Sequence, residues 1–200
     1  MKASEQGRPY RMVARAEAAA ATAERIMDAY VELFNERPSD QIGLDQIAAL
    51  AGVTVQTVLR RFGSKEKLFA ATTRRESERV RDDRFVVTPG DVTGAVANLI
   101  DHYEEMGDFV MRMLAQEESV PAIKAITDNG RLLHRDWCEK AFAPFLPPAG
   151  SDTGDRRRAQ IVAICDVYTW KLLRRDSELS RRDTEQAIVE MLAPFTEEAL

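Results

Sequence analysis

Side chains that can hydrogen-bond to base edges and to phosphates gather in residues 54–61, which read TVQTVLRR. A glutamine amide can pair with adenine and an arginine guanidinium with guanine, so Gln56 and Arg60 are candidates for reading bases. Val55 and Leu59 can contact thymine methyl groups. Hydroxyls and a second arginine suit phosphates, which fix the position of a protein on DNA. The expected DNA contacts in this segment are Thr54, Val55, Gln56, Thr57, Leu59, Arg60 and Arg61.

The surrounding residues predict two short helices joined by a tight turn. Ala48 is small, as required where helix backbones approach closely, and Gly52 suits the left-handed position that ends a helix. Thr54 is a favourable N-cap for the second helix. Val58 and Phe62 are four residues apart and give that helix one buried edge. The pattern fits a helix-turn-helix that presents an exposed basic helix to a major groove. The alternative is an ordinary helical hairpin with a polar outer face.

A third helix is predicted to begin directly afterwards, in the segment SKEKLF at residues 64–69. Ser64 suits its N-cap. Lys65 lies in its first turn, where a cation opposes the helix dipole. A phosphate held between Lys65 and the free N–H groups of that turn would explain the cation, so we expect Lys65 to contact DNA as well.

From about Ala16 to Thr73 the sequence resembles the TetR-type bacterial repressors. Three segments carry the resemblance: IAALAGVT at 47–54, the spacing from Thr57 to Phe62, and SKEKL at 64–68. The resemblance implies a homodimer that binds double-stranded, palindromic operator DNA. It also implies release of the operator when a small-molecule effector enters the C-terminal domain.

Three positions depart from the pattern of that family. Gly43 stands where the family usually has threonine, so a helix cap and a phosphate contact are expected to be missing. Leu59 and Arg61 stand where the family usually has aromatic residues. The operator sequence therefore cannot be taken from relatives.

The net charge of −5 is unevenly distributed. Residues 1–84 carry 15 Lys/Arg against 13 Asp/Glu, a balance of +2, and residues 85–200 carry 13 against 20, a balance of −7. Because the local field at the contact surface governs DNA binding, the total does not exclude it. No run is long and apolar enough for a membrane span, and the two cysteines, Cys138 and Cys165, are expected to be buried thiols in a reducing cytoplasm.

Apolar periodicity predicts an all-α fold in three parts. Residues 1–15 are expected to form a flexible basic N-terminal arm, with a tail that makes no contact as the alternative. Residues 16–84 are predicted as a three-helix domain with the helix-turn-helix and a connector helix. Residues 85–200 are predicted as a larger helical domain for ligand binding and dimerisation. Within it we expect one helix to end at Gly107 and a single helix to span 156–173.

Adaptable methionine and aromatic side chains in the C-terminal half can line a cavity for an apolar or amphipathic effector, although each can equally be core. These candidates are Tyr103, Met106, Phe109, Met113, Trp137, Phe142 and Tyr168. The last two predicted helices are more apolar than one chain can cover, which predicts a homodimer. The expected interface residues are Ile161, Ile164, Trp170, Ile188, Met191, Leu192 and Phe195.

Enzymatic chemistry finds little support in the sequence. It contains no Gly-rich phosphate loop, no Gly-x-Ser-x-Gly and no His-Glu-x-x-His, so we expect neither catalysis nor a metal or cofactor. His102 and His134 are interpreted as surface or pocket histidines. Two alternatives to a ligand-controlled regulator remain: a regulator with the same DNA-binding head but a protein partner or no effector, and a small α-helical enzyme.

Overall fold

The computed structural model describes residues 7–196, with side chains from residue 13 onward. The regular elements within this range are helical. Internal contacts divide the chain into two compact units, the first ending at Glu76 and the second beginning at Ser77. The division falls inside one continuous helix, α4 (Lys65–Arg84), which therefore contributes to both units.

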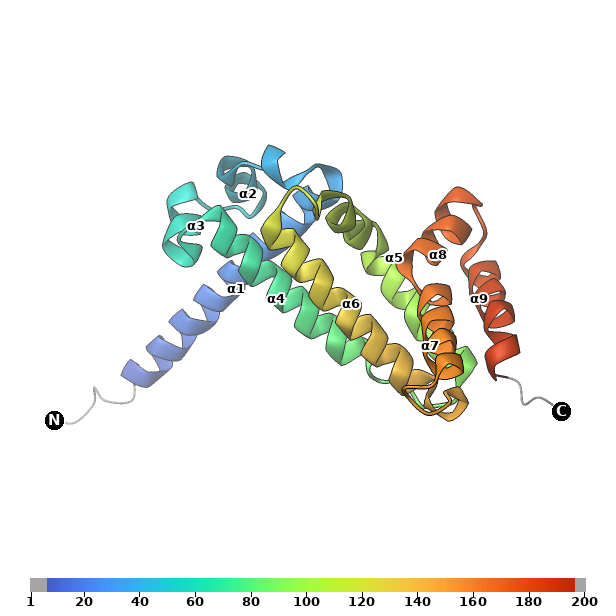
Figure 1. Cartoon of the computed structure of the whole chain (residues 1–200). Coiled ribbons are helices and arrows are strands. Elements are labelled where there is room, and N and C mark those ends of the chain that lie inside the picture. The colour runs from blue at the N-terminus through green and yellow to red at the C-terminus, as the bar shows by residue number, and fades with distance from the viewer. Residues whose placement is uncertain (1–6, 197–200) are drawn as a thin grey trace. The chain divides into compact units, whose positions relative to one another are not determined.

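Unit 1 contains three complete helices and the first part of α4: α1 (Gly7–Glu36), the 3-10 turn η1 (Ser39–Gln41), α2 (Leu44–Leu50) and α3 (Val55–Phe62) (Figure 1). Its core is aromatic, since the rings of Tyr30, Phe34 and Phe69 have centroids 5.9–6.4 Å apart. Ile47 and Val58 bury one edge each of α2 and α3. Packing in this core thus stabilises the short helices α2 and α3, which would be only marginally stable alone.

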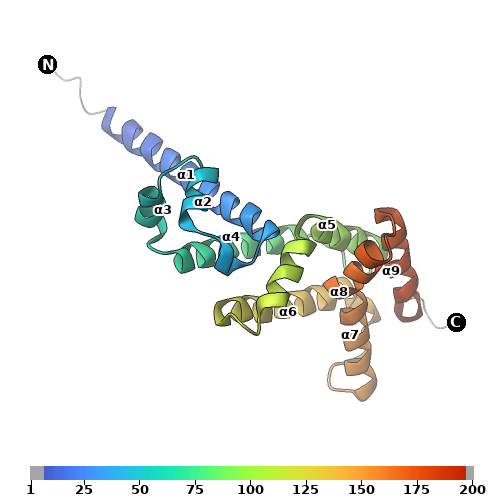
Figure 2. The ribbon, with the colours of Figure 1, turned by 90° about the horizontal axis from the view of Figure 1, so that it is seen from above.

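Helix α1 begins at Gly7, not near residue 16. The part of the expected arm from residue 7 to residue 15 is helical, and residues 1–6 lie outside the described range. In Figures 1 and 2 the first half of α1 runs beyond α2 and α3, and residues 13–18 are exposed on all sides. A run of alanines at 18–21, with the highest helix propensity, offsets the cost of Gly7 and Pro9 near the helix start.

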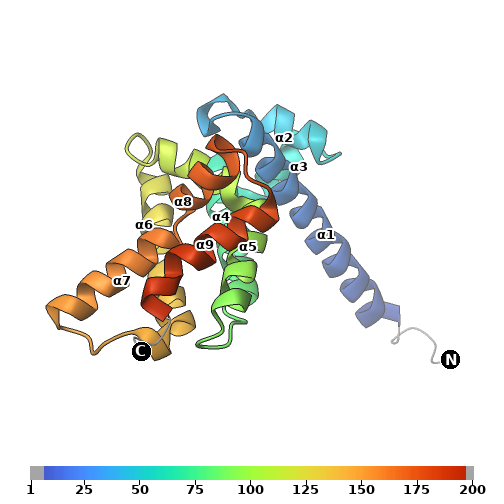
Figure 3. The same cartoon turned by 90° about the vertical axis from the view of Figure 1, so that its right-hand side faces the viewer.

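Unit 2 contains the end of α4 and five further helices: α5 (Val92–Gln116), α6 (Pro121–Ala141), α7 (Asp152–Ile164), α8 (Val167–Lys171) and α9 (Arg181–Thr196), with the 3-10 turn η2 (Ala143–Phe145) and the π-helical turn η3 (Leu172–Asp176). Helix α5 packs against α6, α8 and α9, and α7 packs against α6 and α9, as Figure 3 shows from the side of α9. The two tryptophans, Trp137 and Trp170, are fully buried in the core.

Gly107 does not end a helix, contrary to the sequence prediction, but lies inside α5. A Cβ atom at this position would lie 2.5 Å from the indole of Trp170. The glycine therefore serves close packing between α5 and α8, which sequence pattern alone cannot distinguish from a helix stop.

The prediction of a single helix for residues 156–173 is also wrong, because the helix is interrupted between α7 and α8. The hydroxyl of Tyr103 donates to the carbonyl of Cys165 at 3.0 Å, outside the helical ladder. Asp166 then caps α8 by accepting from the Tyr168 N–H at 2.9 Å. Partners from another helix and a new cap thus replace the hydrogen bonds that a continuous helix would make.

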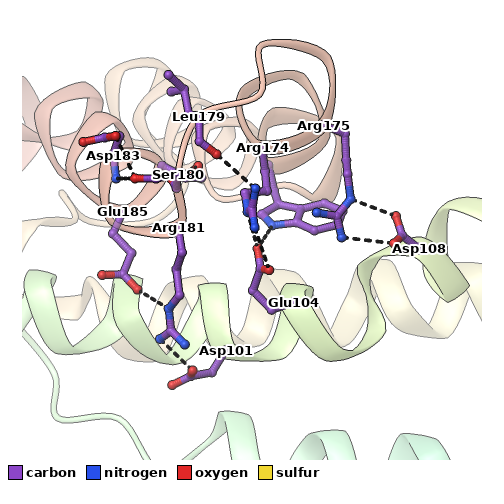
Figure 4. A network of polar contacts seen from close by, with 12 residues as sticks. Asp101, Glu104, Asp108, Arg174, Arg175, Leu179, Ser180, Arg181, Asp183 and Glu185 are labelled. Carbon is purple, nitrogen blue, oxygen red and sulfur yellow. Dashed lines mark hydrogen bonds and ion pairs between the residues drawn. The ribbon is translucent and has the colours of Figure 1, made fainter.

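An ion-pair network fixes α8, η3 and the start of α9 on α5 (Figure 4). Asp101, Glu104 and Asp108 lie on one face of α5 because they are three and four residues apart. Their respective partners are Arg181, Arg174 and Arg175, at 2.7, 2.8 and 3.0 Å. Glu104 also accepts from the Trp170 indole N–H at 3.3 Å.

None of the helices in the described range combines the length and apolarity needed to cross a bilayer.

Candidate nucleic-acid interface

The turn between α2 and α3 is a complete helix-stop motif. Gly52 has φ +65°, the left-handed conformation that glycine adopts without strain. The N–H of Val53 donates to the carbonyl of Ala48 at 2.9 Å, and that of Gly52 to Ala49 at 3.2 Å. These two bonds define the Schellman motif, which satisfies the last carbonyls of α2 and sets the exit direction of the chain.

Thr54 starts α3 as the sequence predicted. Its hydroxyl accepts from the Thr57 N–H at 3.2 Å. Val58 is the only fully buried residue of α3, while Thr57 and Phe62 are half-buried. Helix α3 therefore packs against the other helices of unit 1 along one edge, and its remaining surface is exposed.

The exposed part of α3 carries the chemistry expected for base reading. Of the seven candidates in residues 54–61, all except the half-buried Thr57 are exposed, and Arg60 and Arg61 lie in the last turn. Five residues line one shallow concavity: Thr54, Gln56, Thr57, Leu59 and Arg60. The structure thus gathers amide, hydroxyl, aliphatic and guanidinium groups on one accessible helix.

The Lys65 ammonium is hydrogen-bonded within unit 1, and the phosphate contact expected of this residue stays a prediction. Its ammonium donates to the carbonyls of Ser39 at 2.7 Å and Ile42 at 3.0 Å. These carbonyls belong to η1 and the residue after it, so Lys65 ties the start of α4 to the α1–α2 connection. These two hydrogen bonds offset the unfavourable interaction between the ammonium and the dipole of α4. Ser64, in contrast, caps α4 as predicted, since its hydroxyl accepts from the Lys67 N–H at 3.3 Å.

Gly43 occupies the N-cap of α2, where it offers no side-chain acceptor. The side chain of Gln46 accepts from the Gly43 N–H at 2.9 Å, which supplies one half of a capping box. The cap lost by the departure from the family pattern is thus partly replaced.

A second anchor holds α4 on α1 within unit 1. The Arg75 guanidinium donates to Glu24 and Asp28 of α1, each at 2.8 Å. Charge-assisted bonds to two turns of α1 fix the rotation of α4 about its axis.

In unit 2, six of the seven candidate pocket residues are buried: Tyr103, Met106, Phe109, Met113, Trp137 and Phe142. Tyr103, Trp137 and Phe142 belong to the main core cluster. Tyr168 is instead 50% exposed, because the interruption of the helix at Cys165 and Asp166 turns its side chain outward. It lines a mostly apolar surface groove with Val162, Ala163 and Thr169.

The expected interface residues are mostly directed into their own unit. Ile161, Trp170, Ile188 and Leu192 are buried in the core of unit 2, so they cannot face a second subunit. Ile164 and Phe195 are half-buried, and Met191 is 42% exposed. Tyr168, which the sequence analysis assigned to the pocket, and Leu172 are 50% and 59% exposed on α8 and η3. Neither was expected at the interface, because an unbroken helix was assumed.

Sequence reasoning also missed how the end of α4 is held. Three side chains donate to consecutive main-chain carbonyls: Asn98 to Asp83 at 3.0 Å, Trp137 to Arg84 at 3.0 Å and Lys140 to Phe85 at 2.6 Å. Helices α5 and α6 thereby satisfy carbonyls that a helix end leaves without partners. The conventional signal of a glycine after the helix is lacking at this end.

The cysteines are free thiols, buried as expected. In the buried pair of Cys138 and Cys165, the hydrogen bond between the thiols lowers the pKa of Cys138 and raises the pKa of Cys165. Among the described residues, no group of three His, Cys, Asp or Glu side chains is placed to hold a metal ion.

Comparisons with known proteins agree with this geometry. A family model described as bacterial regulatory proteins of the tetR family matches residues 26–72, which include the whole helix-turn-helix. The chain is 29% identical over 146 residues to HTH-type transcriptional regulators from two strains of Mycobacterium tuberculosis. The aligned part is 73% of this chain, and the chain spans about 60% of the length of these curated relatives.

Solved structures share the fold. A TetR-family regulator from Streptomyces coelicolor is 19% identical with a TM-score of 0.69, over 87% of this chain and 79% of that one. A transcriptional regulator from Rhodococcus sp. RHA1 is 16% identical with a TM-score of 0.67, over 86% and 95%. SmeT, the repressor of the Stenotrophomonas maltophilia multidrug efflux pump SmeDEF, is 14% identical with a TM-score of 0.51, over 88% and 91%.

Proposed function

Because the chain belongs to the TetR family of bacterial transcriptional regulators, we propose that it is a dimeric repressor that releases a palindromic operator when a small molecule binds in unit 2. The observation that carries this proposal is the exposed face of α3, held in place by the Gly52 turn and the Thr54 cap. Repression, operator symmetry and an effector are expectations from the resemblance. SmeT, a repressor with the same fold, is consistent with them.

On DNA, α3 enters the major groove, where some of its side chains contact bases and others contact phosphates. Gln56 and Arg60 read base edges, and Val55 and Leu59 contact thymine methyl groups. Thr54, Thr57 and Arg61 hold phosphates and set the register. Lys65 contributes indirectly, by holding α4 to the α1–α2 connection.

The dimer surface is proposed on the exposed side of α7, α8 and α9. The groove beside Tyr168 is mostly apolar, and Leu172 and Met191 add exposed apolar surface on η3 and α9. Such a patch is costly to leave in water and suits a two-fold interface. Half-sites one helical turn apart would then be about 34–36 Å apart.

Ligand control requires that the effector binds one arrangement of the DNA-binding heads better than another. Helix α4 is the covalent route available for this coupling, since it begins next to α3 and ends in unit 2. The buried residues proposed to adjoin the effector are Tyr103, Met106, Phe109, Met113, Trp137 and Phe142.

Operator binding is tested by titrating the protein on DNA from the region upstream of its own gene and on a scrambled control, over a salt series. Sequence-specific binding with a stoichiometry of two chains per site is the expected result. Equal affinity for both DNAs at every salt concentration would contradict the proposal.

A further inference from the structure

Arg84, the last residue of α4, is a buried arginine without a carboxylate partner. Its side chain is only 6% exposed. The Nη2 group donates to Nδ1 of His134 at 3.3 Å, and the guanidinium carbon lies 4.6 Å from the Trp137 ring centroid and 5.8 Å from that of Tyr103. Among the described side chains no Asp or Glu forms an ion pair with Arg84, and its Nε has no hydrogen-bond partner.

The neighbours of Arg84 do not neutralise it. Because arginine only donates, the Nδ1 of His134 accepts, and Nε2 carries the hydrogen that is donated to the Val162 carbonyl at 3.1 Å. The rings of Trp137 and Tyr103 attract a cation but supply no negative charge. Other arginines of unit 2 differ: Arg131 pairs with Glu117, and Arg174 with Glu104.

A second histidine nearby, His102, is also uncharged. Burial is the main cause that lowers the pKa of His102 to about 3, and the positive charges of Arg84 and Arg79 act in the same direction. His102 is therefore neutral at physiological pH and adds no further charge. The result is one buried positive charge bordered by neutral, aromatic and apolar groups.

Burying an unpaired charge costs much more than burying a paired one, so the lack of a counter-ion among the side chains that the structure describes requires an explanation. We propose that Arg84 is the receptor for the single carboxylate of the effector, whose remaining body is apolar. This inference rests on the proposed ligand control in unit 2. A single carboxylate matches the single charge, whereas a phosphate dianion would need further donors. An apolar body matches the aromatic rings around the guanidinium.

The position of Arg84 gives such a ligand a direct route to the DNA-binding unit. The side chain would bind the carboxylate, while its own carbonyl is held by Trp137. Both contacts act on the C-terminal turn of α4, whose N-terminal turn is anchored by Lys65 in unit 1.

The test measures ligand binding to the free protein, without DNA. Nonanoate and nonanamide form one matched pair, and 4-phenylbutyrate and 4-phenylbutanamide form another. By isothermal titration calorimetry we expect the carboxylate of at least one pair to bind about tenfold tighter than its amide, or more, as for a hydrogen bond to a charged group. Equal binding of acid and amide in both pairs, or no binding of either acid, would overturn the inference.

Variants assign the effect to Arg84. In Arg84→Met the acid and amide are expected to bind within about twofold of each other, since the counter-charge is gone. Arg79→Met removes a neighbouring positive charge from the same helix, one that pairs with Glu105, and should keep the preference for the acid. A preference that survives in Arg84→Met, or disappears equally in Arg79→Met, would overturn the assignment.

Two readouts protect the test against misfolding. Arg84→Met should unfold at the same temperature as the parent or higher, because it removes an unpaired buried charge. The ¹⁵Nε–H resonance of Arg84 in the parent protein should shift on titration with the acid and not with the amide; no shift at saturation would contradict direct contact. Operator binding is measured separately, so a protein that prefers the acid but does not bind operator would refute the proposed function and leave the Arg84 site intact.

Discussion

The indole N–H of Trp137 donates to the main-chain carbonyl of Arg84 at 3.0 Å, which joins the C-terminal part of α6 to the last residue of α4. Asn98 and Lys140 hold the carbonyls on either side. The end of the connector helix is thus fixed by side chains from two neighbouring helices. Movement of α5 or α6 would be transmitted to α4 through these bonds.

Replacing Trp137 by Phe should loosen the last turn of α4, because a carbonyl loses its donor while most of the buried ring remains. We expect a loss of about 2 kcal/mol in the free energy of unfolding, from the lost hydrogen bond and a small cavity. Hydrogen exchange at residues 81–87 should accelerate. Trp170→Phe is the control: it should destabilise unit 2 comparably without affecting exchange at 81–87.

Arg60→Ala should weaken operator binding by about 1–3 kcal/mol and relax the preference at one base pair per half-site. Arg61→Ala should weaken binding to all sequences and reduce the salt slope by about one. Lys65→Met should lower the melting temperature of unit 1 without changing the salt slope, since its ammonium binds carbonyls within the unit. Titrations over a salt series distinguish the three. A salt slope reduced by Lys65→Met would restore the phosphate contact.

Leu172→Glu should dissociate the dimer while the chain stays folded, because Leu172 is exposed in the single subunit and a buried unpaired charge is not tolerated in an interface. Ile188→Glu should unfold unit 2, since Ile188 is fully buried in it. Sedimentation and circular dichroism separate these outcomes. A Leu172→Glu variant that remains dimeric would move the interface elsewhere.

Gly107→Ala should destabilise unit 2, although alanine is the better helix former by about 1 kcal/mol. The added Cβ would meet the Trp170 indole at 2.5 Å, and overpacking of this kind costs about 1–3 kcal/mol. In a Trp170→Leu background the same substitution should be neutral or stabilising. Denaturation of the two single variants and the double variant provides the measurement, and additive effects would exclude the clash.

Stability should fall below pH 6.5 because of His102. Its folded pKa of about 3 lies below the ordinary value of 6.5, so the unfolded state binds the extra proton between these values. The stabilisation is complete above pH 6.5 and is lost as the pH falls towards 3, by about 2 kcal/mol between pH 7 and pH 5. His102→Gln should reduce this dependence. Identical pH profiles for parent and variant would contradict the shifted pKa.

The sequence was sufficient where local chemistry decides the structure. Gly52, Thr54 and Ser64 act within a few residues of themselves, so the turn and both caps could be predicted. The exposure of α3 followed from the spacing of Val58 and Phe62.

Where the sequence prediction failed, the role of the residue depends on partners that are distant along the chain. Gly107 serves Trp170, far along the chain, and Lys65 serves carbonyls 23 and 26 residues earlier. At the break before α8, the Tyr103 hydroxyl from α5 binds the Cys165 carbonyl, a contact that the local sequence does not indicate. Arg84 could not be identified as buried, because nothing near it in sequence marks a charge that is removed from water.

The boundary between the two units lies within a helix and not within a loop, and this limits how the protein can be divided or recombined. A fragment that ends at Glu76 would terminate in mid-helix, with unsatisfied carbonyls where the ladder continued. If the DNA-binding units of two relatives were exchanged, the two parts of α4 would have to be joined without inserting or deleting a residue. Each inserted residue would turn every later side chain of the helix by about 100° about the helix axis. Insertions and deletions should therefore accumulate in the 147–151 loop and be excluded from the middle of α4.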